Sequence, residues 1–327
     1  MPSASPSTLL ARWPSANPSS AIPVLGRALT TSRPGLSTGR RAVQIRPFRL
    51  PASEHNGKEG RGMYVVRHLD GASDRVDVFV EDPGAPGVRA TGEDKGKGKG
   101  KAEDGGDEVM ASSSDGTVAH SRWTHCAVGL PPSTTTTSSS PPAPGGPPTT
   151  GAGALFDTFI QRALFAPPAP GGQPSSARDP SAWQPRAQAV SLEGYTFVVG
   201  GGAGGGGGGT PGAGAGAADW EVKVSSVGLK GGSASGTTRG CIVEVTYLAV
   251  PYLPPGSTLV HDFLLSLFPP AAVKNGEVEL VSIAEDVFVD AGLLDPPVNE
   301  DDEGRWEWRD KHSTFAYVHQ FKKEGLL

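Results

Sequence analysis

The chain has 327 residues, among them 46 glycines and 31 prolines, and a net charge of −5. Together, glycine and proline are roughly twice as frequent as in an average protein, where they make up about 12% of the residues. Most of the excess lies in tracts that bury too little apolar surface to offset the entropy of ordering them. The remaining chain, roughly 200 residues, is enough for one sizeable core. The acidic balance gives no reason to expect a nucleic-acid surface, which needs a clustered basic face.

The cysteine content and the hydropathy pattern exclude two further classes. Cys126 and Cys241 are far apart in the sequence, which fits buried thiols in a reducing compartment better than a disulfide framework. No run approaches the ~20 consecutive apolar residues that a membrane-spanning helix requires. We therefore expect neither a disulfide-stabilised domain nor contact with a membrane.

Biased tracts divide the chain into ordered islands. Residues 93–108 alternate glycine and lysine before an acidic run, residues 131–150 are rich in proline, serine and threonine, and nine of the ten residues 200–209 are glycine. Neither a helix nor a strand is expected in such tracts. The sequence predicts a disordered N-terminus at 1–20 and one domain at 21–327, with disordered insertions at about 83–117, 131–150, 167–182 and 200–218.

Alternating apolar residues predict the first strands in chain order. An imperfect strand carries Val43, Ile45, Phe48 and Leu50 and is interrupted by Pro47. Two more strands, at 63–69 and 76–80, are joined through Asp70-Gly71, a dipeptide typical of hairpins.

Further strands follow in the C-terminal half. Residues 220–224 alternate apolar and charged side chains, as expected for a half-buried strand, and residues 241–248 and 278–283 are rich in β-branched residues. Several short strands without βαβ spacing favour an antiparallel sheet curled into an open barrel.

Three segments have the periodicity of helices. Apolar residues recur with helical spacing over 155–164, and a second helix, with Ser257 as its N-cap, is expected to end at Pro269. A third and shorter helix surrounds Phe315, Val318 and Phe321. Helices that cover one face of an antiparallel sheet make the fold class α+β.

Few residues suggest catalysis or metal binding. The glycine tract matches a dinucleotide fingerprint only by chance, since no helix opens after it. Glu277 and Glu279 stand two apart on one side of a predicted strand, where a carboxylate pair inside a barrel can hold a metal ion. The simpler interpretation is a solvent-facing pair opposite Val278 and Leu280.

Two groups of histidines could suggest a metal site. One is a weak zinc motif of His120, His125 and Cys126, and the other is His312 and His319, which share a helix face without a carboxylate. We expect no cofactor and no metal.

The C-terminal half contains blocks whose order matches a known family. These are Tyr195–Phe197, Asp219–Val227, Arg239–Tyr247, His261–Phe268 and Ser313–Phe321. They resemble, in this order, the strands and helices of subunit 20 of the Mediator complex of RNA polymerase II, a head-module subunit, in its fungal form.

An upstream part of the chain extends the resemblance. Met63–His68 followed by Val76–Phe79 is similar to the hairpin of that family. Ser225 stands where the family usually has glycine, and the family's N-terminal strand has no clear counterpart among the prolines of residues 2–18. The blocks cover about a third of the chain.

The resemblance implies an open barrel of paired antiparallel strands with flanking helices and no chemistry of its own. It implies a heterodimer with Mediator subunit 18, contact with the C-terminal helix of subunit 8 and with other head-module subunits, and coactivation of transcription in the nucleus. No direct contact with nucleic acid is expected. The alternatives are a barrel-type, metal-dependent RNA triphosphatase-like enzyme and an unrelated β-rich binding domain. The structural and interface candidates are Trp220, Val222, Val224, Val243, Val245, Tyr247, Phe263, Leu264, Leu267, Phe315 and Val318.

Overall fold

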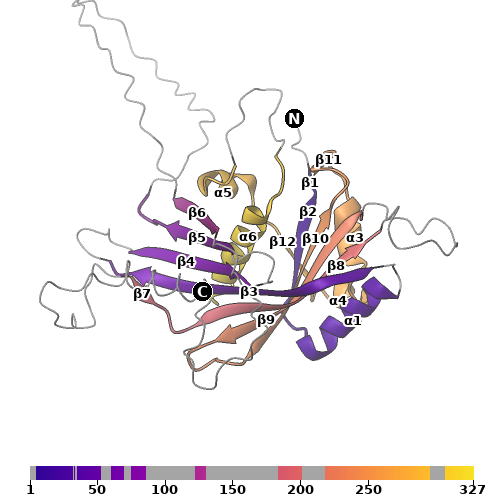
Figure 1. The fold of residues 1–327 in the computed structure, drawn as a ribbon, viewed down its shortest axis with the longest axis horizontal. Helices are drawn as coiled ribbons and strands as arrows, with labels where there is room; N and C mark the ends of the chain where they lie inside the picture. Colours follow the sequence, from indigo (N-terminus) through magenta and orange to yellow (C-terminus); the bar gives the residue numbers. More distant parts are fainter. Residues whose placement is uncertain are drawn as a thin grey trace, which may run out of the picture.

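The computed structural model is an α+β fold built on one large antiparallel sheet (Figure 1). The residues that it describes are 5–31, 33, 35–52, 60–69, 75–85, 122–129, 183–200, 218–294 and 306–327. The helix expected at 155–164 lies outside these residues, as do nearly all of the four insertions expected to be disordered. Among the described residues, no helix is long and apolar enough to cross a membrane.

Ten strands form the main sheet, in the order β12-β2-β10-β9-β8-β3-β4-β5-β6, with β7 paired to β3 off this path. The described strands, including β1 and β11 of a separate two-stranded sheet, are β1 (Ser5–Pro6), β2 (Thr8–Trp13), β3 (Leu36–Leu50), β4 (Arg61–His68), β5 (Arg75–Glu81), β6 (Trp123–Gly129), β7 (Gln184–Pro185), β8 (Ala189–Val199), β9 (Trp220–Lys230), β10 (Thr238–Tyr247), β11 (Tyr252–Leu253) and β12 (Glu279–Val281). All described pairings are antiparallel, and β1 pairs separately with β11.

The sheet curves but does not close into a barrel. Its two ends are β12 and β6, which pair with β2 and β5 respectively and not with each other. The long strand β3 runs across the sheet and joins its two halves (Figure 1). Pro47 lies within β3 and does not end it. Its carbonyl accepts a hydrogen bond from the backbone N–H of Arg186, which follows β7.

Helices cover both faces of the sheet, not one face as the sequence predicts. They are α1 (Pro18–Thr30), α3 (Leu259–Leu265), α4 (Pro270–Lys274), α5 (Glu285–Asp290) and α6 (Asp310–Lys323). The reason is visible in β9, where Val222 and Val224 pack on the side of α1 and α3, whereas Val227 and Leu229 pack on the side of α6. Such a strand is buried on both sides.

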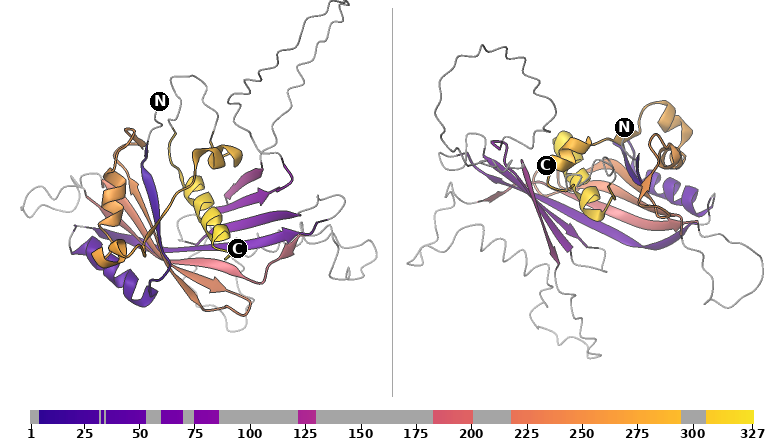
Figure 2. Two further views of the ribbon diagram at one scale, coloured as in Figure 1. Left: turned by 180° about the vertical axis from the view of Figure 1, so that it is seen from behind. Right: turned by 90° about the horizontal axis from the view of Figure 1, so that it is seen from above.

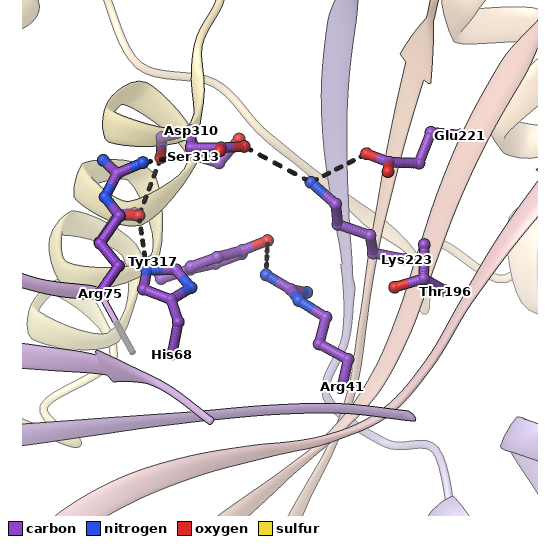
Figure 3. A pocket seen from close by; sticks show the side chains of 10 residues that line it. Arg41, His68, Arg75, Thr196, Glu221, Lys223, Asp310, Ser313 and Tyr317 are labelled. Carbon is purple, nitrogen blue, oxygen red and sulfur yellow. Dashed lines mark hydrogen bonds and ion pairs between the residues drawn. The ribbon is translucent and has the colours of Figure 1, made fainter. Parts of the chain in front are cut away.

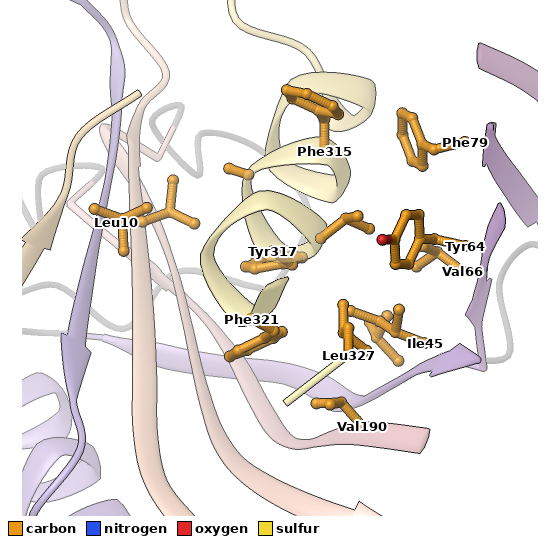
Figure 4. Close-up of a cluster of buried hydrophobic side chains, with 14 of the residues drawn as sticks. Leu10, Ile45, Tyr64, Val66, Phe79, Val190, Phe315, Tyr317, Phe321 and Leu327 are labelled. Atoms are coloured by element: carbon orange, nitrogen blue, oxygen red, sulfur yellow. The ribbon is translucent and has the colours of Figure 1, made fainter. Parts of the chain in front are cut away.

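The larger core lies on the face that α6 covers, called here the α6 face. Phe315, Tyr317 and Phe321 point from α6 toward the strands, and each is fully buried (Figure 4). Phe315 lies 5.5 Å from Phe79 between ring centroids and 5.2 Å from Trp123, distances typical of packed aromatic pairs. Helix α6 therefore fills the hollow of the curved sheet (Figure 2).

The N-terminus differs from the sequence-based expectation of disorder at 1–20. Residues 8–13 form β2, which pairs with β10 on one side and β12 on the other. Leu10 and Ala11 are fully buried on opposite faces of the sheet. The prolines that make this strand hard to recognise in the sequence lie beyond its ends. Pro18 occupies the first turn of α1, where its missing N–H costs nothing.

The helix ends also refine the prediction. Helix α3 begins at Leu259, with Thr258 rather than Ser257 at the N-cap position and no side-chain cap hydrogen bond there. Helix α6 has 14 residues and is longer than its apolar pattern suggests. Nine of its side chains are buried, polar ones included, because it lies in the hollow of the sheet rather than on the surface.

Candidate functional site

A cluster of buried charged residues lies between the α6 face and helix α6. In the sheet register, Thr196 of β8, Lys223 of β9 and Glu244 of β10 form one row. Gly39 of β3 continues this row, and Arg41 lies two residues farther along β3, opposite Gly194. Because alternate residues of a strand share a face, these side chains all point toward α6.

Glu244 is the centre of this cluster and is only 2% exposed. Lys223 Nζ lies 2.9 Å from its Oε1, and Ser313 Oγ of α6 donates to the same oxygen at 3.1 Å. The Tyr317 hydroxyl donates to Oε2. A buried carboxylate is stable when its oxygens accept several such hydrogen bonds, and here both oxygens are engaged.

Arg41 reaches the same cluster through Tyr317. Its Nη2 donates to the Tyr317 hydroxyl at 2.9 Å, and its guanidinium lies 5.2 Å from the centre of that ring. Burial acts to raise the pKa of Glu244, but the charges of Lys223 and Arg41 outweigh it and hold that pKa at about 2. Burial raises the pKa of Tyr317, so its hydroxyl stays protonated as the link between Arg41 and Glu244.

A pocket of about 210 Å³ opens beside this cluster (Figure 3). It is lined by Arg41, His68, Arg75, Thr196, Glu221, Lys223, Asp310, Ser313, Thr314 and Tyr317. Lys223 also approaches Glu221 Oε2 at 3.0 Å, and Arg75 Nη1 lies 3.5 Å from Asp310 Oδ2. The lining is polar and carries charges of both signs.

A second buried carboxylate, Asp77 of β5, lies on the same side. Arg75 Nη2 and His125 Nε2 lie 3.0 and 2.9 Å from its Oδ1, and His68 Nε2 lies 3.4 Å from Oδ2. Burial acts to raise the pKa of Asp77, but these hydrogen bonds hold it well below its usual range. Within the described part of the chain, no group of three or more histidine, cysteine and acidic side chains could hold a metal ion.

The acidic pair suggested by the sequence lies away from this pocket. Trp13 Nε1 and Ser15 Oγ donate to Glu277 Oε2 at 3.3 and 3.2 Å. Glu279 begins the three-residue edge strand β12. Leu280 is 42% exposed, so the expected alternation of charged and buried residues fails at this short edge.

The histidine motifs are also separated. His120 lies outside the described residues, His125 contacts Asp77, and Cys126 is exposed. His312 and His319 both belong to α6, but His312 is a hydrogen-bonded core residue.

Eight of the eleven structural and interface candidates are core residues. Fully buried, and so available for packing within the chain, are Val222, Val224, Val243, Val245, Leu264, Leu267, Phe315 and Val318. The other three, Trp220, Tyr247 and Phe263, are half-buried, and Trp220 contacts both of the others. The rings of Trp220 and Phe263 are parallel at 4.0 Å, and Tyr247 lies 4.7 Å from Trp220.

This aromatic cluster has features of a partner surface. The Arg33 guanidinium lies 4.2 Å from the centre of the Phe263 ring and donates to Ser266 Oγ at 2.6 Å. Aromatic residues and arginine are enriched at protein interfaces. The adjoining segment that follows β10 exposes Leu248, Val250 and Tyr252. We call Trp220, Tyr247, Phe263 and Arg33 the aromatic surface.

The pH dependence of stability follows from His312. The Arg309 backbone N–H donates to Nδ1 at 2.8 Å and Nε2 lies 3.1 Å from the Leu293 carbonyl, so the neutral ring fits with its proton on Nε2. Burial lowers the pKa of His312 to about 4 from 6.5. The unfolded chain therefore takes up the proton first as pH falls, and stability should drop by about 3 kcal/mol between pH 6.5 and 4.

Urea unfolding of the wild type and of His312→Gln across that pH range checks this expectation. In His312→Gln, the free energy of unfolding should lose most of its pH dependence above pH 4.5. The contribution of Glu244 to stability is lost only at lower pH. Burial also lowers the pKa of His319, which adds to the slope in both proteins. Identical slopes in the two proteins would contradict the assignment to His312.

Comparisons with known proteins identify no family for this chain. No protein-family model matches the sequence, and no curated protein matches it. Among solved structures, the chain is similar to the PH1819 protein of Pyrococcus horikoshii OT3, with 7% identity over 80% of this chain and 86% of that chain. The TM-score is 0.29, which is too low to support an argument about fold or function.

Proposed function

We propose that this chain is a non-enzymatic subunit of the Mediator head module that forms a heterodimer with Mediator subunit 18 in the nucleus. In this role it also contacts the C-terminal helix of subunit 8 and other head-module subunits, and it acts as a coactivator of RNA polymerase II. The curved sheet with helices on both faces corresponds, in this proposal, to the open barrel that the sequence resemblance implies.

The observation that carries the proposal is the order of the family-like blocks along the chain, together with their contacts. The blocks at 219–227 and 239–247 fall on the neighbouring strands β9 and β10. Trp220 of the block at 219–227 stacks on Phe263 of the block at 261–268, and Glu244 of the block at 239–247 accepts from Ser313 of the block at 313–321. Segments that resemble one family thus form a single packed unit, as expected if the resemblance reflects a shared fold.

The buried carboxylates support the non-enzymatic part of the proposal. Glu244 is occupied by Lys223, Ser313 and Tyr317, and Asp77 by Arg75 and His125. Each has a structural role in neutralising or orienting buried cations. The aromatic surface, half-exposed and held rigid by ring stacking, is the part that we assign to partner contact.

Co-expression with Mediator subunit 18 tests the proposal. The two chains should elute as one 1:1 complex from a sizing column. Phe263→Ala, which removes the stacked ring, should weaken the complex by about 2 kcal/mol, as expected for a hot-spot aromatic. Tyr195→Ala changes a ring that is 45% exposed on β8 and serves as the control. Separate elution of the two wild-type chains would contradict the proposal.

A further inference from the structure

The polar pocket contains hydrogen-bond donors that the protein does not use. Arg41 is 5% exposed, yet its Nη1 is buried without a partner among the described residues. The buried Nε of Arg75 is in the same state. Both side chains line the pocket, one from β3 and one from β5 (Figure 3). A buried donor without an acceptor is costly, so these groups call for an acceptor that enters from the pocket.

The charge balance of the deep part of the pocket favours an anion. Arg41 is a buried cation, the Lys223 side chain is 16% exposed, and Glu244 is the carboxylate buried beside them. The third cation of the lining, Arg75, is balanced by the buried Asp77. Arg41 has no carboxylate within ion-pair distance among the described residues. The other acidic residues of the lining, Glu221 and Asp310, are 31% and 68% exposed, so solvent screens their charges more than that of Glu244. One additional negative charge would therefore neutralise the buried part of the pocket.

The size and the donor arrangement select the kind of anion. The pocket of about 210 Å³ is well above the ~10–15 Å³ that a single water requires. The donors approach from strands that are separated by β4, and Thr196 adds a hydroxyl to the lining. A tetrahedral oxyanion offers oxygens in several directions, whereas a carboxylate offers two in one plane. Guanidinium groups match phosphate oxygens well.

We propose that this pocket is a binding site for a phosphate or phosphoryl group, held by Arg41 Nη1 and Arg75 Nε. The site is independent of the proposed Mediator role. The shared ligand chemistry is a tetrahedral oxyanion, and it has two possible sources: free phosphate and a phosphorylated side chain of another protein.

Phosphorus NMR titration of the 327-residue chain tests the site, with inorganic phosphate, O-phosphoserine and acetate as probes. Phosphate should give a saturable shift or broadening of its signal, and acetate should not compete with it. Tighter binding of O-phosphoserine would assign the site to a phosphorylated side chain. Equal or weaker binding would assign it to free phosphate.

Three variants make the test specific. Arg41→Gln should weaken phosphate binding at least about tenfold, since it removes a charge-assisted donor. Arg40→Gln removes the same charge from the neighbouring, exposed position of β3 and should bind normally. If Arg41→Gln does not fold, Thr196→Glu provides the second test, because it places a carboxylate in the half-exposed lining and should abolish binding. No saturation in the wild type, or equal binding by Thr196→Glu, would overturn the proposal.

Discussion

Glu244→Gln is expected to lower the free energy of unfolding by about 3 to 5 kcal/mol, because it leaves buried cations without their carboxylate. Lys223 Nζ would keep Glu221 at 3.0 Å and Asp310 at 3.9 Å, whose side chains are both more exposed than that of Glu244. Arg41 would lose the negative charge nearest to it, reached through the Tyr317 hydroxyl. Urea unfolding at pH 7, where Glu244 is fully ionised in the native protein, measures the effect.

An exposed ion pair of similar length provides the matched control. Glu193 and Lys230 lie 2.8 Å apart, but both side chains are about half exposed. Solvent screens such pairs, so Glu193→Gln should change stability by less than about 1 kcal/mol. A similar loss in both variants would mean that burial does not set the strength of the Glu244 cluster.

Leu264→Asp is expected to destabilise the chain by more than about 4 kcal/mol and to abolish assembly with subunit 18. Leu264 is fully buried in α3 and belongs to the core on the face of α1 and α3. The substitution removes its packing and buries a carboxylate without a partner. Since domains are stable by only about 5 to 15 kcal/mol, much of this variant should be unfolded at 37 °C.

The same helix supplies the control for this change. Leu259 opens α3 and is 44% exposed, so Leu259→Asp should stay within about 0.5 kcal/mol of the wild type. Circular dichroism melts and co-elution with subunit 18 report folding and assembly together. A folded, assembling Leu264→Asp protein would contradict the position of α3 in the core.

Local patterns predicted most of the fold's strands and two of its described helices. The alternation in 63–69 and 220–224 and the β-branched run at 241–248 correspond to β4, β9 and β10. The strand at 8–13 was missed because the surrounding prolines suggested disorder, although they lie outside the hydrogen-bonded residues. The second covered face was missed because period-two alternation in 220–224 looked like one buried and one solvated side.

The charged cluster could not be predicted in the same way. Arg41, Glu244 and Tyr317 are far apart in the sequence, and only the strand register and the position of α6 bring them together. One signal was available: Glu244 interrupts an otherwise apolar, β-branched strand, which is unusual unless the carboxylate is paired. Its partner could not be identified from that signal alone.

Affinity purification of the tagged chain from nuclear extract of its own cells tests the central claim most directly. If the chain is a Mediator head subunit, mass spectrometry should recover the head-module subunits, with subunit 18 the most abundant. Leu264→Asp should lose these partners, and Leu259→Asp should retain them. Recovery of a different set of partners, without subunit 18 and other Mediator subunits, would contradict the account.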